Sequence, residues 1–149
     1  MMNLRELLEN PDFTQNVACT KAKYKAGDVI LNEDEDSQDV YLILDGKAQV
    51  TTSIDADVGE LTRPLARLST DDIFGELSMF DGEPRSAEVV ALTDCEIAKF
   101  DGPGMIQFLD DHPETGYFVL REIFMCLVMR MRQNNIRTKT VLQLYLNEK

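Results

Sequence analysis

Hydrophobic and polar positions follow two different patterns along this chain. From Ala18 to Phe100 the apolar residues come in short runs, and glycine, aspartate and asparagine separate one run from the next. Beyond Gly102 the apolar residues gather into longer stretches that begin near a proline. Evenly spaced short strands are typical of a β-barrel or jelly roll, and proline is common at the first position of a helix. The sequence therefore predicts a mainly β protein with helices toward its C-terminus.

The first part contains a series of predicted strands. Val40–Leu44 is apolar throughout, so both of its faces are expected to be covered. Asp45-Gly46 predicts a two-residue hairpin that pairs this strand with the next one, and Leu92–Asp94 is expected to join the last two strands as another pair. Pro64 is expected to break the strand in which it lies. The predicted strands are 21–25, 29–31, 40–44, 47–52, 61–68, 86–91 and 95–100, with loops at 32–39 and 55–60.

Helices are expected at both ends of the chain. Residues 3–10 predict a short helix with Asn3 as its cap, which Pro11 stops. Residues 103–111 predict a second helix, and Pro113 opens a longer one.

The long C-terminal helix is apolar on more than one side. Between residues 117 and 131 nearly every position is hydrophobic. A helix of this kind has more than one surface to bury against. One side is expected to cover the end of the β-structure and the other to meet the same helix of a second subunit in a homodimer. The alternative is a helix buried within one monomer.

Length, charge and residue types exclude several classes of function. A chain of 149 residues predicts a single domain, 1–149, and a net charge of −12 disfavours nucleic acid, which needs a basic surface. Three scattered cysteines and the single His112 support neither a disulfide framework nor a metal site. The N-terminus lacks a signal peptide's apolar segment, and the apolar run Ile123–Met129 is too short to cross a bilayer. We expect a cytoplasmic protein.

Residues 74–87, Phe-Gly-Glu-Leu-Ser-Met-Phe-Asp-Gly-Glu-Pro-Arg-Ser-Ala, carry the chemistry that a small organic anion needs. Gly75 permits close backbone approach. A short helix over 76–80 would leave its first amides free at the favourable end of the helix dipole. Arg85 is able to grip a phosphate with two parallel hydrogen bonds, while Glu76 accepts a hydroxyl proton. The segment therefore predicts a pocket that holds both ends of one ligand.

This segment resembles the phosphate-binding cassette of the cyclic nucleotide-binding domain family. Upstream, Tyr24–Ile30 and Val40–Gly46 resemble the opening strands of that family in the right order. The resemblance covers roughly residues 20–135. It implies a double-stranded β-helix, a jelly-roll-like β-roll of about eight strands with a short N-terminal helix and a long C-terminal helix. The expected layout is a lead-in at 1–17, the roll at 18–101 and helices at 102–149.

The resemblance also implies which residues bind the ligand. Glu76 is expected to accept the ribose 2′-hydroxyl and Arg85 to bind the phosphate. By position in the family pattern, Val50 and Leu65 are expected to lie against the base. Asn134 and Asn135 either bind the base edge or mark a fraying helix end. The full expected phosphate and ribose site is Gly75, Glu76, Leu77, Ser78, Arg85, Ser86 and Ala87.

One residue departs from the family pattern. Glu88 stands where relatives commonly have Thr or Trp, which influence the preferred base. A carboxylate that faces outward changes nothing, whereas one that faces inward repels phosphate or selects a base with donors. Cyclic AMP is the expected ligand and cyclic GMP the alternative.

These features predict a stand-alone regulatory module that binds a cyclic nucleotide and signals through its C-terminal helix to a dimer mate or effector protein. No nucleophile–base pair or metal set accompanies the segment, so we expect binding and no catalysis. Residues 136–149 are too few for a helix-turn-helix domain. Two alternatives stay open: a degenerate, ligand-free interaction module, and the sensor fragment of a transcription regulator.

Overall fold

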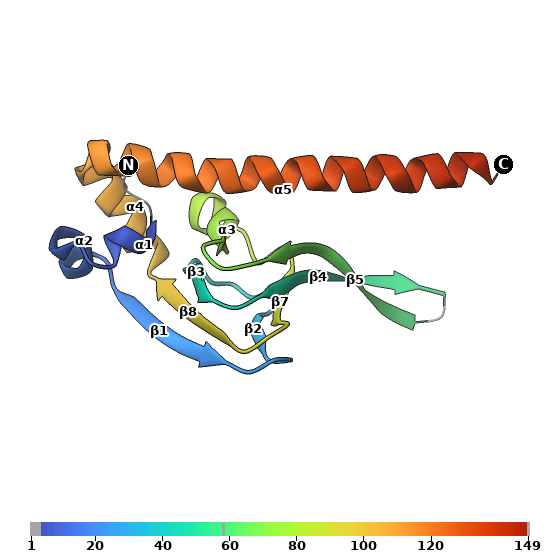
Figure 1. The fold of residues 1–149 in the computed structure, drawn as a ribbon, viewed down its shortest axis with the longest axis horizontal. Helices are drawn as coiled ribbons and strands as arrows, with labels where there is room; N and C mark the ends of the chain where they lie inside the picture. Colours follow the sequence, from blue (N-terminus) through green and yellow to red (C-terminus); the bar gives the residue numbers. More distant parts are fainter. Residues whose placement is uncertain (1–3, 58, 149) are drawn as a thin grey trace.

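Two four-stranded antiparallel sheets form the body of the protein, and helices cover one side of it (Figure 1). The computed structural model describes residues 4–57 and 59–148. One sheet has the order β1-β8-β3-β6 and the other β2-β7-β4-β5. The strands are β1 Cys19–Tyr24, β2 Val29–Leu31, β3 Val40–Asp45, β4 Ala48–Ala56, β5 Gly59–Leu68, β6 Ile73–Phe74, β7 Glu88–Ala91 and β8 Cys95–Phe100. This β-roll and its flanking helices confirm the predicted fold class.

Strand β3 passes through the centre of the core. Its side chains alternate between two apolar clusters, since Val40 and Leu42 pack in one and Tyr41 and Ile43 pack in the other. All four side chains are buried. A strand covered on both faces gains apolar contacts at every position, which explains its uninterrupted hydrophobic sequence.

Two predicted strand pairings are wrong. Asp45-Gly46 does not close a hairpin, because β3 and β4 lie in different sheets. Leu92–Asp94 likewise connects β7 of one sheet with β8 of the other. Gly46 has a φ of +118°, and a Cβ there would lie 2.7 Å from the carbonyl oxygen of Asp94. The two turns therefore pack against each other, and each carries the chain from one sheet to the next.

The true hairpin is formed by β4 and β5, which pair from Ala48↔Leu68 to Ala56↔Gly59. Most of the expected loop at 55–60 is therefore strand. Pro64 does not break β5, because the register shifts there: Val50 faces Ala66 and Thr51 faces Pro64. Leu65 is left as a bulge without an opposite residue. The distal part of this hairpin projects away from the roll (Figure 1).

The N-terminal region contains two short helices where one was predicted. Helix α1 covers only Leu4–Leu7, and α2 covers Pro11–Asn16. Pro11 begins a helix and does not stop one, because the side chain of Asn10 caps it by accepting a hydrogen bond from the Asp12 amide. The predicted Asn3 cap lies outside the described residues.

The two C-terminal helices are α4, Gly102–Asp111, and α5, Pro113–Asn147. Helix α4 agrees with the predicted helix over residues 103–111. Helix α5 is 35 residues long and continues through Asn134 and Asn135, so the alternative of a fraying helix end there is wrong. Its C-terminal half extends beyond the roll alongside the β4–β5 hairpin (Figure 1). No helix among the described residues has the length and hydrophobicity to cross a membrane.

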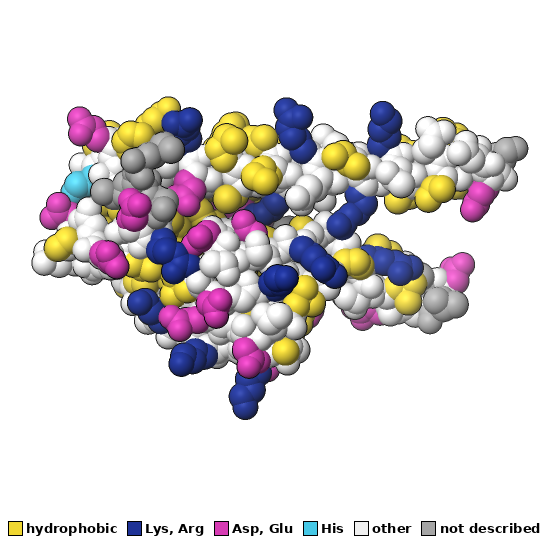
Figure 2. Space-filling view, viewed as in Figure 1, with side chains coloured by type: hydrophobic (Ala, Val, Ile, Leu, Met, Phe, Trp, Pro, Cys, Tyr) yellow, Lys and Arg dark blue, Asp and Glu magenta, His cyan; other side chains and the backbone are white. Residues whose placement is uncertain are grey.

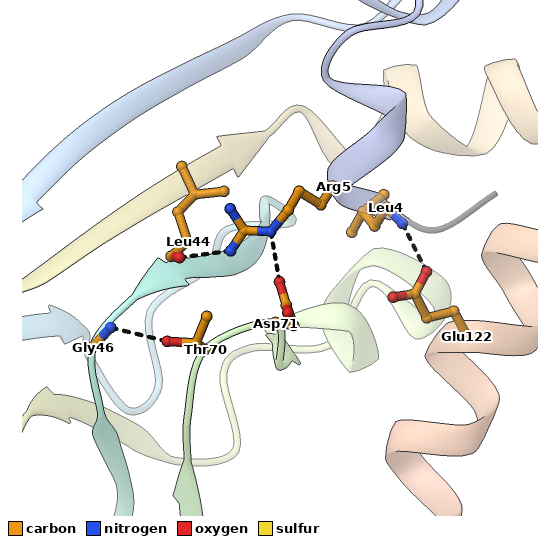
Figure 3. A network of polar contacts seen from close by, with 7 residues as sticks. All are labelled: Leu4, Arg5, Leu44, Gly46, Thr70, Asp71 and Glu122. Carbon is orange, nitrogen blue, oxygen red and sulfur yellow. Dashed lines mark hydrogen bonds and ion pairs between the residues drawn. The ribbon is translucent and has the colours of Figure 1, made fainter.

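Polar contacts fasten α1 to the roll and to α5 (Figure 3). The backbone amide of Leu4 donates to Glu122 Oε2 at 2.7 Å. Arg5 donates through Nε to Asp71 Oδ1 at 2.7 Å and through Nη2 to the Leu44 carbonyl at 2.6 Å. Burial raises the pKa of the Glu122 carboxyl, and the hydrogen bond from the Leu4 amide partly offsets this rise. The first helix thus holds the N-terminal half of α5 in place.

Candidate functional site

A cavity of about 440 Å³ lies between the roll and α5. Most of its walls are apolar, with a few polar groups from helix α3 (Glu76–Asp81), from the segment between α3 and β7, and from α5. Such a mixture is typical of small-ligand sites. The lining residues are Leu31, Val50, Leu65, Ala66, Phe74, Gly75, Glu76, Leu77, Ser78, Arg85, Ser86, Ala87, Val89, Leu127, Arg130, Met131, Asn134 and Asn135.

Gly75 and α3 form the polar floor of this cavity. Gly75 has a φ of +81°, and a Cβ there would lie 2.9 Å from the Asp39 carbonyl oxygen and 3.0 Å from Arg85 Nη1. Only glycine fits this position without strain. The following residue, Glu76, is 2% exposed although it is a carboxylate. The sequence-predicted short helix is present, and it places Glu76 inside the protein.

Arg85 is buried and held in a fixed orientation. Its Nε donates to Ser37 Oγ at 2.9 Å, Nη1 to the Gly75 carbonyl at 2.7 Å and Nη2 to the Asp39 carbonyl at 2.7 Å. The centroid of the Tyr41 ring lies 5.9 Å from the guanidinium carbon of Arg85. A guanidinium has five N–H donors, so these three bonds leave two for a ligand. The positive charge has no carboxylate partner among the described residues, which favours an anion.

Arg130 of α5 reaches into the cavity and pairs with Glu76. Its Nη1 lies 2.6 Å from Glu76 Oε1. Glu76 Oε2 and Arg130 Nη2 are buried and have no hydrogen-bond partner within the described part of the chain. Unpartnered buried polar atoms are costly, and a ligand that offers both a hydroxyl donor and an acceptor would satisfy them.

The side chains expected to contact a base all line the cavity. Val50 and Leu65 come from the β4–β5 hairpin, and Asn134 and Asn135 come from α5. Glu88 is not among the lining residues, whereas its neighbour Val89 is. Since side chains alternate along a strand, Glu88 points to the other face of β7. The departure from the family pattern therefore leaves the cavity unchanged.

The structure brings together every site residue expected from the sequence, since all eleven line one cavity. Sequence reasoning missed Arg130, and it also missed Ser37 and Asp39, which orient Arg85. A signal for Arg130 was present, because a charged residue inside an apolar helical stretch needs a polar partner. Nothing in the acidic loop indicated Ser37 or Asp39, since Asp39 acts through its backbone carbonyl. No three His, Cys, Asp or Glu residues among those described are grouped to hold a metal ion.

Comparison with known proteins agrees with this geometry. The family model for the cyclic nucleotide-binding domain matches residues 21–112, more than half of the chain. The cGMP-dependent 3′,5′-cGMP phosphodiesterase A of Dictyostelium discoideum is 29% identical over 130 residues, which are 80% of this chain and 14% of that protein. The CRP-like cAMP-activated global transcriptional regulator of Mycobacterium tuberculosis is 27% identical over 112 residues, 75% of this chain and 47% of that one.

A solved structure shows the same fold. The crystal structure of a cyclic nucleotide-binding domain from Methylobacillus flagellatus has a TM-score of 0.71 and 29% sequence identity, and the match covers 83% of this chain and 66% of that one. This chain spans less than half the length of either curated relative described above.

Proposed function

The chain belongs to the cyclic nucleotide-binding domain family, and from this premise we propose that it is a sensor module that binds a cyclic nucleotide in the cavity beneath α5. The observation that carries the proposal is that Arg85 and Glu76 both line one cavity of about 440 Å³. Arg85 keeps two N–H donors for a phosphate, and Glu76 Oε2 is a buried acceptor without a partner among the described residues. These groups suit a phosphate and a ribose hydroxyl on one ligand.

The remaining assignments follow from position. We assign the phosphate and ribose to the part of the cavity lined by Gly75, Leu77, Ser78, Ser86 and Ala87. We assign the base to the part lined by the apolar side chains of Val50 and Leu65. We propose cyclic AMP as the ligand, with Asn134 and Asn135 meeting the base edge, because amide groups match adenine's donor and acceptor pattern. Cyclic GMP is the alternative, and the relatives' names include both nucleotides.

We propose that the signal passes through Arg130. A ligand that donates to Glu76 Oε2 and accepts from Arg130 Nη2 would connect α3 with α5, because Arg130 lies on α5. Because α5 extends past the roll, a change at this contact alters the position of a long, exposed helix. The proposed function is therefore binding and signalling, without a reaction.

The outward side of α5 supports the proposal of a homodimer through residues 117–131. Tyr117, Leu120 and Phe124 are 47–61% exposed and recur at the spacing of a coiled-coil seam. The packing of this helix against the roll covers a different side, so the alternative of a helix wholly buried in one monomer is wrong. The effector protein and the cytoplasmic location remain predictions.

Thermal unfolding with and without cyclic AMP or cyclic GMP tests the proposal. Ligand at about 100 times its dissociation constant is expected to stabilise the fold by about 2.7 kcal/mol, and to raise Tm by about 5–10 °C. Arg85→Ala should abolish the shift, whereas Arg132→Ala, which removes an exposed arginine of α5, should retain it. If neither nucleotide shifts Tm, the ligand-free interaction module is the better account.

A further inference from the structure

The side of α5 that faces the roll changes character along the helix. Val119 and Ile123 are 0% and 1% exposed and belong to the apolar core. From residue 130 onward α5 makes polar contacts with the roll, beginning with the Arg130–Glu76 pair. Apolar burial therefore fixes the N-terminal half of the helix, and side-chain hydrogen bonds hold the rest.

Arg137 makes the outermost of these polar contacts. Its Nη1 donates to the carbonyl oxygen of Leu65 at 2.6 Å and to that of Pro64 at 3.2 Å. Both carbonyls lie at the bulge of β5, where Leu65 has no opposite residue in β4. β5 is the edge strand of its sheet, so its outer carbonyls are available to the helix. A local irregularity of β5 thus provides the acceptors for Arg137.

The contact between Arg137 and Leu65 lies beside the cavity. The Leu65 side chain lines the cavity from the hairpin, and Met131 and Asn134 line it from α5. Arg130 and Arg137 are seven residues apart, two helical turns, so they lie on the same side of α5. Beyond this contact the helix and the hairpin separate, and the space-filling view shows open space between them (Figure 2).

We propose that Arg137 is a positioning residue that holds α5 against β5 and thereby sets the rate at which ligand enters and leaves the cavity. This inference rests on the proposed function. Arg130 lines the cavity and pairs with Glu76, whereas Arg137 contacts the backbone of Leu65, whose side chain lines the cavity. Because Arg137 is exposed and bonds to neutral carbonyls, its loss opens the edge without unfolding the domain.

Nuclear magnetic resonance of the ¹⁵N-labelled chain tests the contact without ligand. The acceptor carbonyls of Pro64 and Leu65 belong to the peptide groups whose amide nitrogens are those of Leu65 and Ala66. Arg137→Gln should therefore shift the amide resonances of Leu65 and Ala66. Arg132→Gln removes the same charge from an exposed position of α5 and is expected to leave them unchanged. Unchanged Leu65 and Ala66 resonances in Arg137→Gln would overturn the proposed contact.

Exchange spectroscopy with cyclic AMP on the same samples tests the consequence for ligand binding. Arg137→Gln should raise the association and dissociation rate constants together by about 3- to 10-fold, the range for one modest hydrogen bond, with little change in Kd. Arg137→Lys should restore slower exchange. A rise in the dissociation rate alone would overturn the proposal, because Arg137 would then stabilise only the bound state.

The two tests separate the two proposals. If neither cyclic AMP nor cyclic GMP binds the parent chain, the proposed function and the exchange-rate role fail together. The contact with β5 is then still judged by the Leu65 and Ala66 amides. If the parent binds nucleotide and Arg137→Gln leaves both rates unchanged, only the role of Arg137 fails.

Discussion

Arg130 and Glu76 form an ion pair across the cavity, 2.6 Å between Nη1 and Oε1, although 54 residues separate them in sequence. Glu76 is 2% exposed, so Arg130→Met would leave a buried carboxylate without its counter-charge. We expect this change to lower the free energy of unfolding by about 3 kcal/mol. Urea denaturation measures the loss.

A double-mutant cycle isolates the pair from other effects of each substitution. Glu76→Gln keeps the shape of the side chain but removes its charge. The double variant Glu76→Gln/Arg130→Met should lose less stability than the two single variants combined. Additive losses would mean that the two side chains do not depend on each other.

Gly75→Ala is expected to destabilise the fold more than Gly27→Ala does. Both glycines have positive φ, +81° and +94°, so both substitutions carry backbone strain of about 1–2 kcal/mol. A Cβ at Gly27 meets nothing within 4 Å, whereas one at Gly75 meets the Asp39 carbonyl and Arg85. The difference between the two urea midpoints measures this clash, expected at about 1–3 kcal/mol. Equal losses would contradict the close packing around Gly75.

Stability should depend on pH through Glu122. Burial raises the pKa of this carboxyl, with further contributions from Asp71 and Glu6. The folded state therefore holds its proton to higher pH than the unfolded state does, and stability from this group falls as pH rises from the ordinary glutamate value through the raised one. Relative to Glu122→Gln, the parent should gain stability as pH is lowered through this window. Urea unfolding from pH 7 to pH 4 measures the difference, with Glu60→Gln as the charge-matched comparison.

Phe124→Gln should weaken the proposed dimer. Phe124 is 61% exposed and lies on the seam of α5, so the polar side chain removes apolar contact area without disturbing the monomer core. Met129→Gln, 60% exposed on another side of the helix, is the control and should dimerise like the parent. Light scattering over a concentration series gives the mass. A parent chain that stays at 16.9 kDa at every concentration would remove the dimer proposal.

The sequence predicted the positions of most strands and helices, but not which strands pair. Positions of strands follow from local hydrophobic pattern, whereas pairing depends on contacts between distant segments. Asp45-Gly46 was predicted to be a hairpin turn because an Asp-Gly pair between two strands is a typical hairpin sequence. That pattern depends only on the turn and the residues next to it. In the protein, the turn from Leu92 to Asp94 packs against Gly46 and sends the strands to different sheets.

The sequence named residues that lie together in the structure where chemistry and chain order coincide. Glu76 and Arg85 lie in one continuous motif, and both line the cavity. Arg130 lines the cavity and Arg137 contacts its neighbour β5, both from a helix that follows much later in sequence, so their partners depend on where that helix docks. Leu65 was assigned to the base by position, but its bulge and its carbonyl bond to Arg137 have no local signature.

The docking of α5 has a consequence for how the protein is made. Three contacts hold α5 in place, and their partners are separated in sequence by 54, 72 and 118 positions. Each contact therefore closes a large loop of chain. Contacts of such separation form slowly. During synthesis the roll and its Glu76–Arg85 segment leave the ribosome before residues 127–137 do. A nascent chain therefore carries only part of the cavity wall until α5 docks.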